Sequence, residues 1–356
     1  MPDSSSLPIQ GARPSIEIAG QRDATLTASM LGLDIIDSAD GLARCELLFG
    51  NWGGPDKPGF QHFDRSKLDF GKGMKVKLAE DLLFEGRVSA INAHFPDGGP
   101  PQIGVCLEDR LQDLRMTRRT RCFTDASLGD VIRQIAGDHG LQAQVDLHGE
   151  QHKVLAQVNQ SDLAFLRDLA RREDAQIWVT GTQLKAAARA QRNSGGVELA
   201  WAGKLREFTV SADLAHQRTS LIASGWDVAD KRVAKHEADE AAVRAELNGG
   251  DSGVATLKRA FGVRADTLAH GLAFDGGDAR ALAEASLRHL ARRFVVGSGV
   301  AETSAKLVVG AKLALKGLGP LFEGDYTLTY LHHRFDLKAG MRTEFRCECP
   351  SVGKGR

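Results

Sequence analysis

The most enzyme-like stretch of the sequence is His236-Glu237-Ala238-Asp239-Glu240, which carries one imidazole and three carboxylates. A zinc protease helix places two histidines four residues apart, so that both imidazoles share one helix face. Here Glu240 stands where the second histidine would be. A histidine and a carboxylate at this spacing are common on solvated helices, so the stretch does not predict a metal site.

Other residues that could do chemistry fall short of a site for similar reasons. Cys347 and Cys349 share one face of a predicted strand, but no second pair of ligands stands at zinc-finger spacing. His332 and His333 point to opposite faces of one strand and cannot hold one ion together. Gly317-Leu318-Gly319 lacks the third glycine and the strand-to-helix context of a nucleotide loop.

The sequence contains no serine nucleophile elbow, no cysteine flanked as in a protease, and no pair of carboxylates that stands apart. We therefore predict no catalytic residues, no cofactor-binding residues, no metal ligands and no cofactor, and we expect that the protein is not an enzyme. The arginines from Arg110 to Arg121 form a basic run, but no aromatic residues interleave with them to stack on bases. A solvated linker or a subunit-contact strand is the preferred interpretation, with no sequence-specific contact to nucleic acid.

Composition narrows the class of protein. A chain of 356 residues exceeds what one hydrophobic core usually serves, so two to four subdomains are expected. Lys+Arg and Asp+Glu both total 46, so the chain has no net charge that would attract it to nucleic acid or an anionic membrane. A net charge near zero also favours self-association. No apolar run approaches the roughly 20 residues of a membrane span. The polar N-terminus and five scattered cysteines predict synthesis in a reducing cytoplasm without a signal peptide.

The elements that organise the chain are two copies of one β pattern. Leu83-Phe84-Glu85-Gly86 returns unchanged as Leu321-Phe322-Glu323-Gly324, each after an alternating strand signature, and each glycine suits a bulge or tight bend. Later residues then correspond: Val88 to Tyr326, Ala90 to Leu328, Ala93-His94-Phe95 to His332-His333-Arg334-Phe335, and Cys106 to Cys347. The repeat predicts two similarly folded β units.

Helical periodicity appears between and within these units. Residues 127–138 and 160–170 each place apolar residues on one helical face, Ser161 is a good N-cap, and Gly140 a helix stop. With a hairpin over 176–187 they predict a small α/β module. The second β unit is interrupted by two further predicted helices, Ala229–Leu247 and Asp278–Phe294.

Several motifs in order resemble the late control D family of phage tail proteins, which shares its fold with type VI secretion spike hubs and myophage baseplate hubs. The departures are Gln160-Ser161-Asp162 in place of Glu-Ser-Asp, and Glu173-Asp174-Ala175-Gln176-Ile177 in place of a Glu-Glu-Gly-Ile turn. The motifs that carry the resemblance are Phe84-Glu85-Gly86-Arg87-Val88, Leu107-Glu108-Asp109-Arg110-Leu111, Arg121–Ile132, Gln160–Ala170, Gly317–Tyr326, His332–Phe335 and Arg342–Phe345.

The repeat and the resemblance together predict an α+β chain: two similar, tube-like β-barrel domains, an α/β module between them, and a helical insertion in the second barrel. The expected parts are a flexible tail (1–13), the first barrel (14–115), the module (116–200), the second barrel (201–228 and 300–350), the insertion (229–299) and a short tail (351–356).

The resemblance implies a structural baseplate hub of a contractile phage tail or a tail-like injection system. It implies a homotrimer that adapts a sixfold inner tail tube to a threefold spike, beside other baseplate subunits, inside a virion or extracellular particle. Since the sequence stops at Arg356, the spike is expected as a separate polypeptide. Two alternatives stay open: a cell-wall hydrolase at a tail tip, and a receptor- or glycan-binding module. The Gly/Pro loop 51–60 is either plain surface or a reach towards a partner through Trp52 and Phe60.

Overall fold

A single large β-sheet runs through both halves of the chain in the computed structural model, which describes residues 13–54, 58–147, 149–192, 194–247 and 249–353. The sheet has 13 strands in the order β16-β21-β24-β23-β3-β4-β9-β8-β7-β1-β2, with β22 and β15 attached beside β23. Its strands are β1 (Ser15–Ile18), β2 (Gln21–Arg22), β3 (Met30–Ser38), β4 (Arg44–Gly50), β7 (Gly73–Leu78), β8 (Asp81–His94), β9 (Gln102–Glu108), β15 (Gly196–Ala200), β16 (Leu205–Ala212), β21 (Val295–Ala301), β22 (Lys312–Lys316), β23 (Gly324–Asp336) and β24 (Gly340–Cys349).

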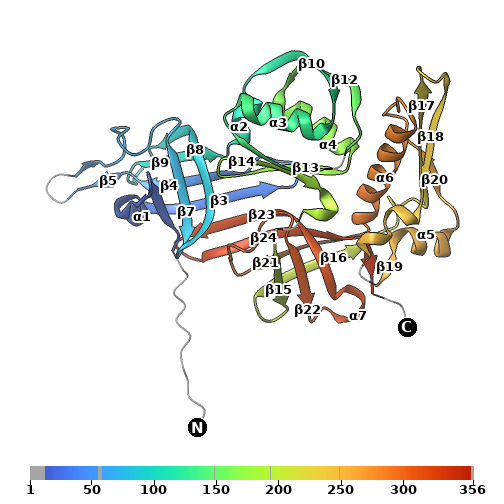
Figure 1. Cartoon of the computed structure of the whole chain (residues 1–356). Helices are drawn as coiled ribbons and strands as arrows, with labels where there is room; N and C mark the ends of the chain where they lie inside the picture. Colours follow the sequence, from blue (N-terminus) through green and yellow to red (C-terminus); the bar gives the residue numbers. More distant parts are fainter. Residues whose placement is uncertain (1–12, 55–57, 148, 193, 248, 354–356) are drawn as a thin grey trace, which may run out of the picture.

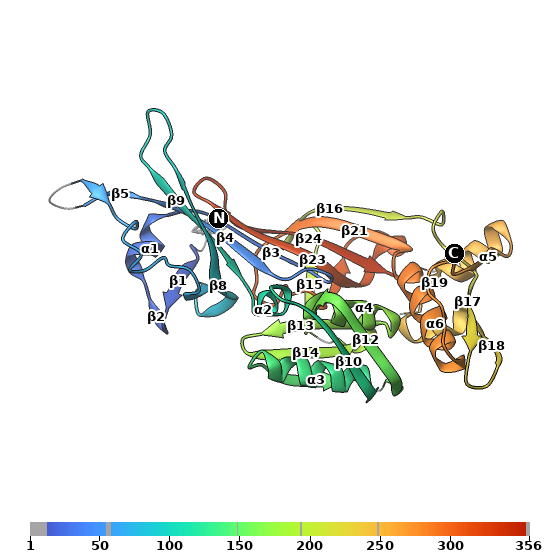
Figure 2. The same ribbon diagram turned by 90° about the horizontal axis from the view of Figure 1, so that it is seen from above.

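The two halves of this sheet repeat one topology. In the first unit, the strands β3, β4, β7, β8 and β9 follow one another in the chain and pair in the order β3-β4-β9-β8-β7. In the second unit, β16, β21, β22, β23 and β24 follow in the same sequence and pair in the equivalent order β16-β21-β24-β23-β22. The prediction of a duplicated β unit is therefore confirmed. Figure 2 shows the two units end to end along the sheet.

Register irregularities fall at equivalent places in both units. In β3 a bulge at Leu31 follows the pair Met30–Phe49. In β16 a bulge at Arg206 follows the pair Leu205–Ala301, which is the equivalent position. Likewise, β8 bulges at Ser89 and β23 at Thr329. Bulges bend and twist a strand, so the two units share their curvature as well as their connections.

The tetrapeptide that suggested the repeat lies in two different local structures. Leu83–Gly86 lies inside β8 opposite β7, whereas Leu321 and Phe322 end the short helix α7 (Gly319–Phe322) and Gly324 begins β23. In the observed pairing Gly86 faces Met74 as Tyr326 faces Leu313, so Gly86 corresponds to Tyr326 and Val88 to Leu328. The sequence alignment around the tetrapeptide was therefore wrong in register. Further on, the match of Ala93-His94-Phe95 to His333-Arg334-Phe335 holds, but Cys347 corresponds to Leu107 and not to Cys106.

Neither unit is a closed barrel within the described residues: the strands form one open sheet, so the two predicted barrels are corrected to two halves of one sheet. Each half still has its own core, because alternate residues of its strands face one side. The first core includes Leu33, Phe49 and Val105, and the second Leu205, Leu328 and Phe345. The chain as a whole is mostly β with helices in separate layers, an α+β arrangement.

The segment between the two units folds as an α/β module, which lies beside the sheet at the junction of the units (Figures 1 and 2). Ser161 caps the second of its two main helices as predicted, Ser127 caps the first, and Gly140 (φ 63°) follows the first. Its elements are α2 (Leu111–Arg115), β10 (Arg118–Ala126), α3 (Leu128–Asp138), β11 (Gln142–Asp146), β12 (His152–Ser161), α4 (Asp162–Arg172), β13 (Ala175–Thr180), β14 (Gln183–Ala188) and the 3-10 turn η1 (Arg189–Gln191).

The insertion in the second unit contains more strand than the sequence suggested. Ala229–Leu247, predicted as a helix, instead turns into β18 and two 3-10 turns. The Asp227 carboxylate accepts the N–H groups of Ala229 and Asp230 and closes a hairpin, so burial follows a strand period. The helix predicted over Asp278–Phe294 is present as α6. The elements are β17 (Ser220–Asp227), β18 (Arg232–Ala238), η2 (Glu240–Ala242), η3 (Arg244–Glu246), β19 (Asp251–Ser252), α5 (Gly253–Phe261), β20 (Ala265–Thr267) and α6 (Gly276–Arg292).

The remaining elements lie at the ends of the molecule. A small ribbon of β5 (Trp52–Gly53) and β6 (Gly59–Phe60) extends from the first unit, beyond α1 (Ala24–Ser29). Residues 351–352, expected in a tail, form β25 (Ser351–Val352), which pairs with β19. Residues 1–12 and 354–356 of the two predicted tails lie outside the described residues.

Candidate assembly edges and the charged junction

The two units meet inside the chain through one strand pair, β23 with β3. On one edge β23 pairs with β24; on its other edge, its beginning pairs with β22 and residues Tyr330–Asp336 pair with β3. The register places Phe335 opposite Leu33 and His333 opposite Ile35. Strand β23 of the second unit thus pairs with β3, the first strand of the first unit's five-strand repeat.

The equivalent edge of the first unit is on β8. Val88 exchanges backbone hydrogen bonds with Gly71 (2.8 Å) and Lys72 (3.0 Å), as Leu328 does with Gly310 and Ala311. Beyond this point, residues Ser89–His94 pair with β9 on one edge and with no other strand among the described residues. This segment has the position that β23 uses to hold β3, but its edge is open.

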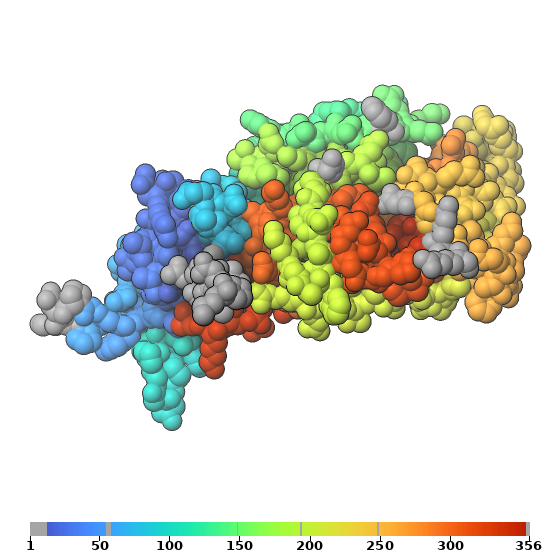
Figure 3. Space-filling view, turned by 90° about the horizontal axis from the view of Figure 1, so that it is seen from below, coloured from blue at the N-terminus to red at the C-terminus, as the bar shows by residue number. Residues whose placement is uncertain are grey.

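The complementary edge is on β16, the first strand of the second unit and the equivalent of β3. It pairs with β21 along Leu205–Ala212 and ends the sheet; apart from a single bridge between Leu205 and Trp201, it has no partner on its outer edge within the described part of the chain. The β8–β9 hairpin projects from the body of the molecule in the space-filling view (Figure 3, teal). The chain therefore contains one filled junction and both halves of a second, unfilled one.

Aromatic side chains gather beside the open edge of β8. Phe95 directly follows that strand and is 62% exposed, whereas its equivalent Phe335 is only 5% exposed because it packs into the core of the first unit. Phe95 lies 6.0 Å from Phe63 and 6.4 Å from Phe60, and Phe60 lies 5.3 Å from Trp52 between ring centroids. The loop residues singled out from sequence thus belong to an exposed aromatic cluster, which is suited to contact a partner.

The sheet face opposite the cores is polar and internally paired near the filled junction. His332 lies 2.6 Å from the Asp34 carboxylate on β3 and 3.8 Å from Glu344 on β24. The Arg346 guanidinium lies 5.0 Å above the Tyr330 ring. His333, one residue on, faces the opposite side and is buried, which confirms that the two histidines cannot share an ion.

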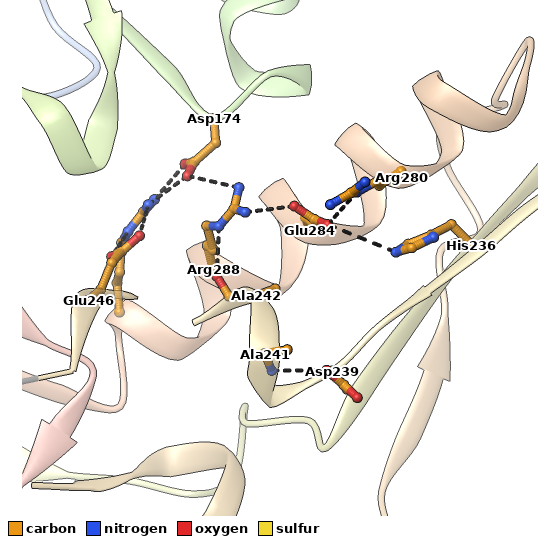
Figure 4. Close-up of polar contacts among 10 residues, drawn as sticks. Asp174, His236, Asp239, Ala241, Ala242, Glu246, Arg280, Glu284 and Arg288 are labelled. Carbon is orange, nitrogen blue, oxygen red and sulfur yellow. Dashed lines mark hydrogen bonds and ion pairs between the residues drawn. The ribbon is translucent and has the colours of Figure 1, made fainter. Parts of the chain in front are cut away.

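A network of ion pairs joins the module to the insertion (Figure 4). Arg292 on α6 is buried and donates to Asp174 (2.5 and 2.6 Å), in the turn after α4, and to Glu246 (2.7 and 2.5 Å). Arg288 approaches the Asp174 carboxylate at 3.9 Å and Glu284 at 2.7 Å (Figure 4). Burial acts to lower the pKa of the Arg292 guanidinium, but its two carboxylate partners outweigh burial and raise that pKa above its ordinary value. The charges therefore fasten the two parts together.

The residues weighed as a metal site lie in this region but do not form one. His236 lies in strand β18, not on a helix, and its ring is 4.0 Å from Glu284 of α6 (Figure 4). Glu240 is in a 3-10 turn, where its carboxylate accepts the Ser252 hydroxyl at 2.6 Å. Within the described ranges, three or more histidine, cysteine or acidic side chains nowhere come together in a way that could hold a metal ion.

Cys347 and Cys349 share one face of β24, as predicted, and both are buried in the core of the second unit. Burial raises the pKa of both thiols, so they stay protonated and do not favour a metal clip. Gly317 and Gly319, both at positive φ, serve the turn between β22 and α7.

Two of the arginines between Arg110 and Arg121 form ion pairs within the module. Arg121 donates to Asp138 (2.6 Å) and Asp162 (2.9 Å), and Arg119 pairs with Asp162 at 3.3 Å. Burial acts to raise the pKa of the Asp162 carboxyl, but hydrogen bonds and these arginines hold it below its usual range. The run thus spans helix α2 and the start of strand β10, so it is not a linker; a strand that contacts another subunit, the other interpretation from sequence, stays a prediction.

A cavity of about 420 Å³ lies between the module and α6. Two of its carboxylates are already paired: Asp278 accepts two hydrogen bonds from Arg172, and Glu284 is held by Arg280 and Arg288. Arginine pairing holds the pKa of Glu284 below its ordinary value although burial acts to raise it. Glu284 is therefore a poor candidate for a proton donor at neutral pH, and the Asp278 carboxylate is already occupied by Arg172.

Comparison with known structures places this fold among tail proteins. The chain is similar to the 43 kDa tail protein of prophage MuSo2 from Shewanella oneidensis (TM-score 0.68, 11% identity, 95% of this chain and 98% of that one). It is also similar to a tail protein of Neisseria meningitidis MC58 (TM-score 0.66, 11% identity, 94% and 96% covered). The E. coli c3393 protein, described as a component of the type VI secretion system, matches with a TM-score of 0.60 at 10% identity, covering 94% of this chain and 77% of that one.

The family assignment comes from a different comparison. A family model described as the Alg8 N-terminal domain matches residues 23–336, so the chain belongs to that family. The resemblance to the late control D family, drawn from short motifs, is wrong as a family assignment, because this model covers most of the chain and describes another family. No curated protein sequence matches. Among the described residues, no helix is long and apolar enough to cross a bilayer.

Proposed function

We propose that the protein is a structural component of a contractile phage tail or a tail-like injection particle. In this role it is a baseplate hub, a trimeric adaptor between a sixfold inner tube and a threefold spike. The observation that carries the proposal is the duplicated unit with its single filled junction between β23 and β3. The fold shared with phage tail proteins and a type VI secretion component supports it.

Duplication gives a physical reason for this role. Three copies of a chain with two equivalent units present six similar units around one axis, which matches a sixfold tube. The same ring keeps a true threefold axis, which matches a trimeric spike. Closed rings need heterologous contacts, in which one edge of a subunit fits a different edge of the next. The open edges of β8 and β16 are two such different surfaces.

The proposal gives the protein no chemistry of its own. Two of the four carboxylates that line the cavity beside α6, Asp278 and Glu284, are engaged by arginines, which argues against these two as the acid pair of the alternative, a tail-tip cell-wall hydrolase. The expected partners are further copies of the chain, inner tube subunits, a spike and other baseplate subunits. The exposed cluster of Trp52, Phe60 and Phe95 is a surface for such contacts.

Electron microscopy of particles from the native host tests the proposal. A gold or antibody label on this chain is expected at the tube end next to the spike, with threefold symmetry. A label found elsewhere in the cell, with no particle carrying it, overturns the proposal. Release of cell-wall fragments by the purified protein, abolished by one carboxylate substitution, would instead favour the hydrolase.

A further inference from the structure

We propose that the open edge of β8 binds strand β16 of a second copy of this chain, in the same register that joins β23 to β3. This inference rests on the proposed function and names its subunit contact at the level of residues. It follows from equivalence inside one molecule: β8 corresponds to β23, and β16 corresponds to β3. The strand pairing that forms once within the chain, between β23 and β3, can also form between β8 of one copy and β16 of another.

The filled junction defines the register of the proposed pair. His332 faces Ile36, and Phe335 faces Leu33. Replacing each residue by its structural equivalent gives the expected antiparallel partners across the two copies. These partners are Ile91 with Ala212, Asn92 with Ser211, Ala93 with Val210, His94 with Thr209, and Phe95 with Phe208.

The backbones are shaped for this contact. Strand β8 bulges at Ser89 as β23 does at Thr329, and β16 bulges at Arg206 as β3 does at Leu31. Since bulges set local twist, the two open edges have the curvature of the two edges that already fit. An edge strand with unpaired backbone groups is a template for another strand, and within the described residues neither Ser89–His94 nor Phe208–Ala212 pairs with a strand on this edge.

The side chains on the two strands are compatible with binding of β16 from a second copy at the open edge of β8. None of the five expected pairs brings like charges together, and Asn92 and His94 face the hydroxyls of Ser211 and Thr209. Phe95 meets Phe208, whose ring already stacks on Phe345 at 6.1 Å in the second core. Phe335 inserts into the first core in the same way. The exposed Phe95 side chain is thus expected to insert into the second core of a neighbouring copy.

Disulfide trapping tests the register directly. In a Cys122→Ser background, which removes the exposed cysteine, the single variants Asn92→Cys and Ser211→Cys are mixed and oxidised with oxidised glutathione. A covalent dimer is expected on a non-reducing gel, and Ala93→Cys with Val210→Cys gives a second pair, since residues directly opposite lie within disulfide reach. Asn92→Cys with Thr209→Cys is the control, displaced by two residues on the same face, and should crosslink at least about tenfold less.

Absence of a crosslink from both direct pairs at high protein concentration overturns the proposed pairing, as does an equal yield from the displaced control. The result is separable from the test of function. A chain located at the tube end that fails to crosslink refutes only the edge pairing. A chain that crosslinks but is absent from every particle refutes only the proposed function.

A second variant tests the role of Phe95 without a risk to folding, because the ring is exposed in the single chain. Phe95→Asp is expected to weaken self-association at least about tenfold, since burial of one aromatic side chain contributes that much or more. Phe70→Asp is the matched control, because Phe70 is 59% exposed but lies outside β8. Equal association constants for the two variants, measured by sedimentation equilibrium, would contradict the insertion of Phe95 into a neighbouring copy.

Discussion

Acidification is expected to weaken the second unit through one buried side chain, His333. Its ring is 2% exposed in the core side of β23, and Nδ1 lies 2.7 Å from the Thr343 hydroxyl. Burial, helped by the neighbouring His332, lowers the pKa of His333 from 6.5 to about 4. The unfolded chain therefore takes up a proton at a higher pH than the folded chain does.

The sign and size follow from linkage. Because the folded pKa is depressed, the contribution of His333 to stability is present above pH 6.5 and is lost as the pH falls towards 4. The difference of about 2.5 pKa units corresponds to roughly 3 kcal/mol in total, of which about 2 kcal/mol is lost between pH 7 and pH 5. In His333→Gln this loss is absent, since glutamine does not titrate.

Urea unfolding of wild type and His333→Gln, measured at steps between pH 7 and pH 4, checks this prediction. Other titrating groups act alike in both proteins, so the difference between their free energies of unfolding isolates His333. That difference should shrink by about 2 kcal/mol from pH 7 to pH 5. His94→Gln removes an exposed histidine at the end of β8 and serves as control. A constant difference across the range would refute the reasoning.

Three further substitutions probe other parts of the fold by chemical denaturation. Burial raises the pKa of Asp109 to about 7, so the contribution of Asp109 to the free energy of unfolding falls as the pH rises from about 4 through 7. Asp109→Asn should abolish this pH dependence. The variant should also cost about 1–3 kcal/mol, because it leaves one of the two backbone N–H groups bound by Asp109 without an acceptor. Gly225→Ala should destabilise by roughly 1–3 kcal/mol, since a Cβ there overlaps the Ala273 carbonyl; an unchanged midpoint would count against the close approach. Arg292→Met should cost about 3–5 kcal/mol, because Glu246 loses its ion pair and Asp174 keeps only the more distant Arg288. Arg206→Met, at an exposed ion pair, should change stability by about 0.5 kcal/mol or less.

Much of the architecture was accessible from local patterns. The helices of the module were predicted because Leu128, Val131 and Ile132 recur at helical spacing and Ser161 stands at the N-cap of the second helix. The helix predicted over Ala229–Leu247 was wrong because alanine-rich composition was read without its turn. Asp227 caps a hairpin there, and Ala234 and Ala238 on one face of β18 are buried with residues of α6.

The repeat shows where local patterns mislead. A four-residue identity suggested the duplication, but those residues lie in a strand in one unit and at a helix end in the other. The true equivalence is carried by pairing order and bulge position, which short identities do not encode. Closure into barrels could not be judged from sequence either, because an open edge and a paired edge have the same alternation of side chains.

The strength of the proposed contact differs from its in-chain equivalent for a physical reason. The β23–β3 junction forms between segments of one chain, where a tether gives an effective concentration on the order of millimolar. The β8–β16 contact has no tether, so the same geometry forms fully only when the concentration of free chains exceeds the dissociation constant. Fixing copies on a tube or spike would supply that tether again. We therefore expect self-association in solution to rise steeply with concentration, and assembled rings to persist only where a partner holds three copies together.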